Sequence, residues 1–205
     1  MIKANHSLFH SWLINQYTSY ILNTDFQAVK IKGDIIADNR SVLLIPNHFS
    51  WWDGFFGWHI NQNIFRKKFH VMMLEQELSQ RMFFSRVGAF SVNLGSRSII
   101  ESLNYSIEIL ESPSNLLLMF PQGKLESQHV NVVKFHKGIE RIAGSVHNTR
   151  IIFAVCLTDY FSNRKPTLTI SLKEYNGTRE LEIMQQEFNN HLQHCIVQQD
   201  INQQI

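Results

Sequence analysis

A histidine and an aspartate stand at a spacing suited to proton transfer. His48 and Asp53 belong to the segment NHFSWWD, which directly follows the apolar run Val42–Ile45. At a strand-to-helix corner, such a carboxylate can bind one ring nitrogen of the histidine and leave the other free to accept a proton. A histidine–aspartate pair with no other signal is often only a helix cap, but the neighbouring Asn47 and Ser50 favour catalysis. The pair predicts a general base, and the nucleophile can then be a hydroxyl of the substrate.

A second loop of chemical interest follows the apolar run Leu116–Met119 and reads FPQGK. In this loop Pro121 fixes the chain as it leaves the strand, and Gly123 lets the backbone approach a ligand closely. Backbone N–H groups of the loop, together with Lys124, can bind a phosphate group or a developing oxyanion. Taken alone, such a loop is also a common turn at the end of a strand.

A third segment, KFHKG, places Lys134 and Lys137 ahead of a short helical pattern. Backbone N–H groups at the start of a helix attract anions, so basic residues there make a candidate anion site. A solvated basic loop has the same composition. The segment by itself leaves both interpretations open.

Apolar runs and alternating patterns predict the elements that position these loops. The predicted strands are Ala28–Lys32, Ser41–Pro46, His70–Leu74, Phe90–Asn93, Leu116–Phe120, Ile151–Leu157 and Thr167–Tyr175. The predicted helices are Ala4–Thr24, Ser50–His59, Glu77–Val87, Ser98–Leu110, Lys137–Ser145 and Arg179–Gln199. Alternation of strands and helices indicates an α/β fold, a single-domain αβ sandwich whose mixed, mostly parallel sheet is flanked by helices. In such sheets binding sites form beyond the carboxyl ends of the strands, where the first two loops fall.

The first 27 residues are predicted to form an N-terminal amphipathic helix ahead of the main domain, residues 28–205. No formal charge occurs from Ala4 to Thr24, but the amides and histidines in this stretch make it too polar to span a bilayer. Read as a helix, it carries an apolar stripe of Leu8, Phe9, Trp12, Leu13, Tyr17, Tyr20 and Ile21. The stripe can lie in a lipid interface or pack on the protein's own sheet, and the sequence favours neither.

Taken together, these segments resemble the lysophospholipid or 1-acylglycerol-3-phosphate acyltransferases of the glycerol-phosphate acyltransferase superfamily. The His-x4-Asp box appears as NHFSWWD, the F-P-E-G box as FPQG and the F-K-x-G box as KFHKGIERIA, in the family's order. Gly88–Val92 is similar to the second box, and Ile151–Leu157 to the final apolar strand. The resemblance spans Val29 to Thr158.

The resemblance implies acyl transfer to a hydroxyl of a lipid acceptor, with His48 as the base and Asp53 as its partner. The donor is then an acyl-CoA or acyl carrier protein thioester, and neither a cofactor nor a metal takes part. The implied substrate-binding residues are Asn47, Ser50, Arg97, Phe120, Pro121, Gln122, Gly123, Lys124 and Lys137. We expect a peripheral protein at the cytoplasmic face of a membrane.

Two departures from the family's pattern leave the acceptor open. The second box usually ends in Arg, where this chain has Leu94, with Arg97 three residues on. The third box usually continues with Glu and then Thr-Arg, where this chain has Gln122, Lys124 and Leu125. Without these guanidinium groups, bidentate phosphate recognition is lost. A lysophosphatidate-type acceptor is the first expectation, a glycolipid, aminolipid or pigment hydroxyl is the alternative, and a non-catalytic lipid-binding relative is a third.

Composition argues against several other classes. The chain is 44% hydrophobic and 18% charged, as in folded globular proteins, and its net charge of +2 gives no support for nucleic-acid binding. A serine hydrolase would require a G-x-S-x-G elbow, which the sequence lacks. Cys156 and Cys195 are expected to be reduced and buried, and His191, His194 and Cys195 lack the further ligands of a metal site.

Overall fold

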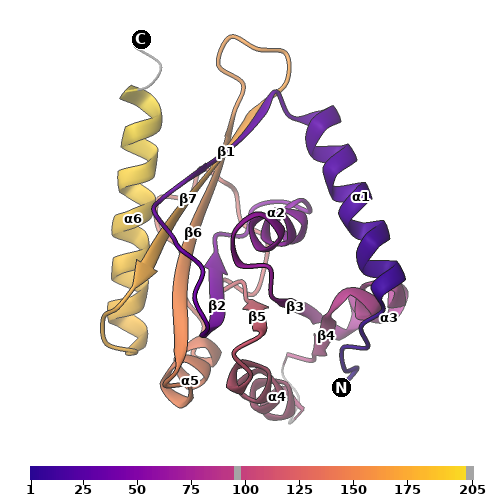
Figure 1. Ribbon diagram of the computed structural model, residues 1–205. Coiled ribbons are helices and arrows are strands. Elements are labelled where there is room, and N and C mark those ends of the chain that lie inside the picture. The colour runs from indigo at the N-terminus through magenta and orange to yellow at the C-terminus, as the bar shows by residue number, and fades with distance from the viewer. Residues whose placement is uncertain (95–97, 202–205) are drawn as a thin grey trace.

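A seven-stranded sheet forms the centre of the protein in the computed structural model, which describes residues 1–94 and 98–201 (Figure 1). The strand order is β1-β7-β6-β2-β5-β3-β4, and every neighbouring pair is parallel except β6 and β7. The strands are β1 (Ala28–Lys32), β2 (Ser41–Pro46), β3 (Lys68–Leu74), β4 (Ala89–Val92), β5 (Asn115–Leu118), β6 (Thr149–Asp159) and β7 (Thr167–Tyr175). The prediction of an α/β fold with a mixed, mostly parallel sheet is confirmed.

Helices cover both faces of this sheet. They are α1 (Leu8–Asp25), α2 (Asp53–Ile60), the π-helical turn η1 (Asn61–Phe65), α3 (Glu75–Gln80), the 3₁₀ helix η2 (Met82–Val87), α4 (Ile99–Glu111), α5 (Gly138–Ser145) and α6 (Leu181–Ile201). One face packs against α4, α5 and α6, and the other against α1 and α2 (Figure 1). The result is a three-layer arrangement, as the sequence predicted.

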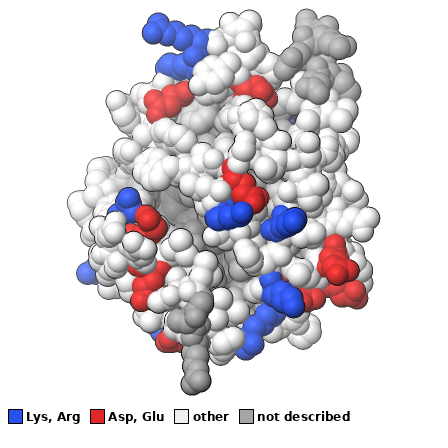
Figure 2. Space-filling model, turned by 180° about the vertical axis from the view of Figure 1, so that it is seen from behind, with Lys and Arg blue, Asp and Glu red and all other residues white. Residues whose placement is uncertain are grey.

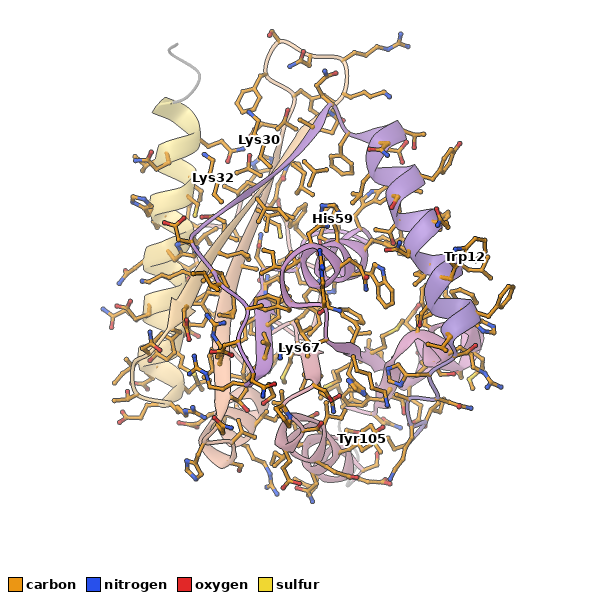
Figure 3. All side chains as sticks on the ribbon, in the orientation of Figure 1. Trp12, Lys30, Lys32, His59, Lys67 and Tyr105 are labelled. Carbon is orange, nitrogen blue, oxygen red and sulfur yellow. The ribbon has the colours of Figure 1, made fainter. Side chains whose placement is uncertain are left out.

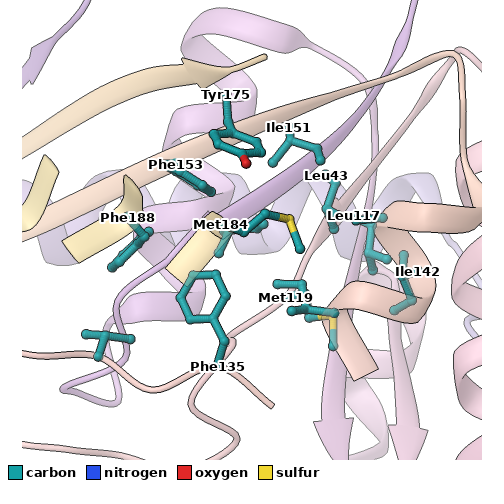
Figure 4. Close-up of a cluster of buried hydrophobic side chains, with 14 of the residues drawn as sticks. Leu43, Leu117, Met119, Phe135, Ile142, Ile151, Phe153, Tyr175, Met184 and Phe188 are labelled. Atoms are coloured by element: carbon teal, nitrogen blue, oxygen red, sulfur yellow. The ribbon is translucent and has the colours of Figure 1, made fainter. Parts of the chain in front are cut away.

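Strand β2 lies in the middle of the sheet and is buried along its whole length. Its side chains alternate between two apolar cores because successive residues of a strand point to opposite faces. Leu43 and Ile45 belong to the core under α4, α5 and α6, part of which Figure 4 shows, whereas Val42 and Leu44 belong to the core under α1 and α2. The loop that follows β2 is therefore anchored to a central strand that is buried on both faces.

Two helix predictions were wrong at their boundaries. The helix predicted for Ser50–His59 begins only at Asp53, because the residues before it turn to meet the Asp53 carboxylate, and it continues to Ile60. The single helix predicted for Glu77–Val87 is two short helices, α3 and η2, separated at Arg81 (φ −134°, ψ 54°). Apolar spacing over so few residues does not distinguish an α-helix from a 3₁₀ helix. The other boundaries differ by a few residues.

Helix α1 exposes most of the stripe that the sequence predicted. Its buried residues are Ile14, Thr18, Ile21 and Leu22, which pack toward α2 and η2. Leu8, Phe9, Trp12, Tyr17 and Tyr20 are exposed, and we call them the α1 aromatic face. Figure 3 shows Trp12 on the outer side of the helix, away from the sheet. Among the described residues, no helix has the length and apolar character needed to cross a membrane.

Residue His70 makes the stability of the fold sensitive to acid. It is 3% exposed, and burial, reinforced by His6 and Lys68, lowers its pKa from 6.5 to about 4. The unfolded chain therefore takes up a proton first as the pH falls, so stability is lost between pH 6.5 and about 4. The full loss is about 3 kcal/mol, from 1.36 kcal/mol per pKa unit.

We expect His70→Gln to flatten this part of the pH profile of the free energy of unfolding, measured by urea denaturation. The exposed His147→Gln serves as the matched control and should keep the slope. Some slope should remain in His70→Gln, because burial also lowers the pKa of His6, whose ring lies edge-on to His70 at 4.6 Å. An unchanged slope in His70→Gln would show that other groups control the acid sensitivity.

Candidate active site

His48 and Asp53 meet in the loop between β2 and α2, as the sequence predicted. His48 Nδ1 lies 2.8 Å from Asp53 Oδ2. The same carboxylate oxygen accepts the backbone N–H groups of Phe49 at 2.7 Å and Ser50 at 2.9 Å, so it acts as an acceptor. His48 Nδ1 must then carry the hydrogen of the shared bond, which leaves Nε2 as a hydrogen-bond acceptor.

The carboxylate of Asp53 is buried, while the imidazole of His48 is accessible. Their side chains are 1% and 22% exposed, respectively. Asp53 begins α2, where the helix dipole favours a negative charge, and its second oxygen accepts the Ser50 hydroxyl at 2.9 Å. The pair therefore combines a fixed, satisfied carboxylate with a ring that solvent or a substrate can reach.

Residue Asn47 ties the site loop to the neighbouring strand β6. Its amide nitrogen donates to the Cys156 carbonyl at 2.9 Å, and its amide oxygen accepts the Cys156 N–H at 2.8 Å. These two bonds continue the pairing of β2 with β6 beyond Pro46, where the regular ladder ends. Asn47 is buried, and its side chain is fully used in holding the backbone directly before His48.

Helix α2 lies close to the sheet because of a glycine. A Cβ on Gly57 would approach the Leu118 side chain of β5 to 2.5 Å, so a larger residue would require either that side chain or the helix to shift. The helix carries Asp53 in its first turn. Close packing at Gly57 thus helps to fix the carboxylate relative to the end of β5, where the second loop begins.

The loop after β5 contacts His48 on its ring and on its backbone. The Phe120 ring stacks on the imidazole, with ring centres 3.9 Å apart and planes at 19°. Gln122 Oε1 accepts the backbone N–H of His48 at 2.6 Å, and the Glu126 N–H donates to the His48 carbonyl at 2.9 Å. The NHFSWWD and FPQGK loops therefore lie against each other at one edge of the sheet, the edge at which the sequence placed both.

The basic residues predicted for substrate binding lie at the exposed rim of this site. Lys124 is largely exposed, and its Nζ lies 3.3 Å from Glu126 Oε1. Lys137 precedes α5 and is exposed, next to His136, whose ring lies beside Gly123. Gly123 adopts a positive φ of 64°, which favours glycine. Arg97 lies outside the described residues.

Two open spaces lie near the site, a small cavity at His48 and a larger cleft on the other side of Gln128. A cavity of about 10 Å³, with room for a single water, lies between His48, Gln122 and Gln128. Gln128 also lines a cleft of about 230 Å³ between the end of β6 and α6. Figure 2 shows a hollow on the rear face, with Lys and Arg side chains interspersed among Asp and Glu around it.

Sequence reasoning missed Glu126. Its carboxylate accepts the Gln122 Nε2–H at 2.7 Å, and the hydrogen bond from Gln122, together with Lys124, lowers the pKa of Glu126. The residue lies outside every box of the family's pattern, and an acid four positions after a glutamine is not a recognisable motif. Its backbone contact to His48 could not be read from spacing, because two loops far apart in sequence make it.

The protein thus has an α/β fold with a histidine–carboxylate pair in the loop after its central strand β2. The chain matches the family model of the acyltransferases over residues 28–158, more than half of its length, and it belongs to this family. The match supports the resemblance to the glycerol-phosphate acyltransferase superfamily. No curated protein sequence shows significant similarity to the chain.

Proposed function

We propose that this acyltransferase moves a fatty acyl group from a thioester to a hydroxyl of a lipid, with His48 as the general base. The observation that carries the proposal is the Nδ1–Oδ2 contact of 2.8 Å between His48 and the buried Asp53, beside an accessible ring. This contact fixes the tautomer in which Nε2 can accept a proton.

In the proposed reaction, His48 carries one proton from the acceptor hydroxyl to the leaving thiolate. His48 Nε2 takes the proton of the acceptor hydroxyl while the hydroxyl oxygen attacks the thioester carbonyl carbon. Asp53 stabilises the imidazolium, and backbone N–H groups of the loop after β5 meet the oxyanion of the tetrahedral intermediate. The carbon–sulfur bond then breaks, and the thiolate takes the proton from His48. The products are an ester and a free thiol.

The predicted substrate-binding residues divide into two groups in this proposal. Asn47 and Gln122 use their side-chain amides to hold the backbone at His48, and the Ser50 hydroxyl donates to Asp53, so these three residues act on the substrate through the His48–Asp53 pair. The residues left to contact substrates directly are Phe120, Gly123, Lys124 and Lys137, whereas Pro121 is buried and its carbonyl accepts the His136 N–H, so it acts by shaping the loop. The donor is an acyl-CoA or acyl carrier protein thioester, and no cofactor or metal is required.

A lysophosphatidate-type lipid is our first acceptor, and an acceptor without phosphate is the second candidate. The observation that favours the second is the pairing of Lys124 with Glu126, since a cation already neutralised attracts a phosphate less. Leu94 is exposed beyond the end of β4 and supplies no charge there. A glycolipid, aminolipid or pigment hydroxyl would fit such surroundings.

Release of free thiol tests the proposal. Purified protein is given acyl-CoA or acyl carrier protein thioester with lysophosphatidate, or with a neutral glycolipid or aminolipid, and the esters are identified by mass spectrometry. We expect thiol release coupled to one ester product. A protein that binds the lipids but releases no thiol with any acceptor would instead be a non-catalytic lipid binder.

The proposal also places the enzyme on the cytoplasmic face of a membrane, where both thioester donors and lipid acceptors are available. The α1 aromatic face supports this, because Phe9, Trp12 and Tyr20 are each more than half exposed and no acidic residue precedes Asp25. Exposed Trp and Tyr side chains suit the headgroup region of a bilayer.

A chain of aromatic contacts connects this face to the catalytic loop. Tyr17 lies 5.6 Å from Phe55, whose ring lies 4.8 Å from Trp51. Trp51 is three residues from His48 and is 55% exposed. An acceptor lying in the bilayer surface would therefore meet the site beside the docked face.

We expect vesicle binding to depend on the α1 aromatic face. Phe9→Ser with Trp12→Ser should weaken co-sedimentation with phosphatidylglycerol–phosphatidylcholine vesicles by at least about tenfold, since each large apolar side chain contributes roughly 1.5–3 kcal/mol when buried. Val197→Ser on the exposed side of α6 is the matched control. Equal binding by both variants would rule out this face as the contact.

A further inference from the structure

Three hydrogen bonds form a closed ring that includes the backbone N–H and C=O groups of the catalytic histidine. The His48 N–H donates to Gln122 Oε1 at 2.6 Å, Gln122 Nε2 donates to Glu126 Oε2 at 2.7 Å, and the Glu126 N–H donates to the His48 carbonyl at 2.9 Å. Gln122 is 3% exposed, so its amide depends on these protein partners and loses hydrogen bonds if either partner is removed. The ring fixes the His48 backbone independently of Asp53, which fixes the imidazole.

The chemistry of the ring dictates which side chains can stand at its two positions. The residue at position 122 must offer an acceptor to the His48 N–H, which both an amide and a carboxylate can do. Between positions 122 and 126, however, one side chain must donate and the other accept. Gln122 with Glu126 satisfies both conditions, whereas two facing carboxylates lack the donor and repel each other.

We propose that Gln122 and Glu126 are a coupled pair of positioning residues that hold the His48 backbone for acyl transfer. The inference rests on the proposed role of His48 as the base. Neither side chain needs to touch a substrate in this arrangement. It follows that the two side chains can exchange places. A carboxylate at position 122 would accept the His48 N–H with one oxygen and, with the other, an N–H of the amide at position 126.

The test compares four proteins: wild type, Gln122→Glu, Glu126→Gln and the double exchange. We expect Gln122→Glu to lower kcat at least about tenfold and Glu126→Gln to lower it less than about fivefold, since a neutral amide oxygen still accepts the bond. The double exchange should recover most of the wild-type kcat. Gln76→Glu, the same change at an exposed position on α3, is the matched control and should leave kcat unchanged.

Two further measurements separate positioning from a direct role in binding. Gln122→Glu should regain activity relative to wild type as the pH is lowered, because a proton shared by the two carboxylates restores the donor. In urea unfolding, the losses of the single variants should add up to more than the loss of the double exchange. This readout needs no substrate.

The outcomes distinguish the two proposals. Recovery of kcat and coupled stability support the pair. A double exchange as slow as Gln122→Glu overturns it, because Gln122 would then contact the substrate, and additive losses of stability overturn it as well. If stability is coupled but wild type releases no thiol with any acceptor, the pair stands and the proposed function fails.

Discussion

Replacement of His48 by alanine is expected to remove nearly all acyl transfer. The variant loses the only group that we assign to proton removal from the acceptor hydroxyl, and general-base catalysis contributes roughly 10²- to 10⁴-fold. Without the imidazole, the acceptor hydroxyl has no base at the site, and Phe120 loses the ring on which it stacks. The measurement is kcat/KM from thiol release with a saturating thioester and the acceptor found active.

The exposed residue His147 supplies the control for this variant. His147→Ala makes the same change in side chain and should keep wild-type kcat/KM. Thermal unfolding shows whether both variants are folded. We expect His48→Ala to be folded, because the ring that it removes is partly exposed. Wild-type activity in a folded His48→Ala protein would remove the basis of the proposed mechanism.

Replacement of Asp53 is expected to have the second largest effect, and two substitutions separate its two roles. Asp53→Asn keeps an oxygen for the N–H groups of Phe49 and Ser50 but loses the charge that stabilises the imidazolium. We expect kcat to fall about 10²-fold or more, with KM little changed, because the charge acts in the transition state.

Asp53→Ala should be as slow and also less stable. It leaves the N–H groups of Phe49 and Ser50 without their acceptor at the start of α2, at a cost of about 1–3 kcal/mol for each that stays buried. Urea denaturation measures this loss, and the exposed Asp34→Asn controls for the removal of a surface charge. If Asp53→Asn kept wild-type kcat, the carboxylate would be a structural cap and not a catalytic partner.

Strand β2 and the loop after it illustrate what local sequence can specify. The apolar run Val42–Ile45, bounded by Pro46, predicts a strand, and the structure buries that strand along its whole length. The four residues between His48 and Asp53 then bring imidazole and carboxylate together across one corner. Both were predicted, since each depends on residues close in the chain.

Two features could not be predicted from the sequence: the division of residues 75–87 into α3 and η2, and the side of α1 that is buried. Phe9 and Tyr20 belong to the same apolar stripe as Ile21, yet only Ile21 is buried. Which side of a weakly patterned helix is covered depends on the surface that it meets, here α2 and η2. That surface is itself assembled from distant segments.

By itself, then, the sequence determined the α/β class, the seven described strands to within a few residues and the pairing of His48 with Asp53. Only the tertiary structure decided that Gln122 and Glu126 hold the backbone of His48 and that Asn47 is tied to β6. The physical reason is the range of the interactions: spacing along a strand or helix fixes contacts within a turn or two. Gln122 is 74 positions from His48, and Cys156 is 109 positions from Asn47. Such contacts exist only once parallel strands have brought their carboxyl ends to one edge of the sheet.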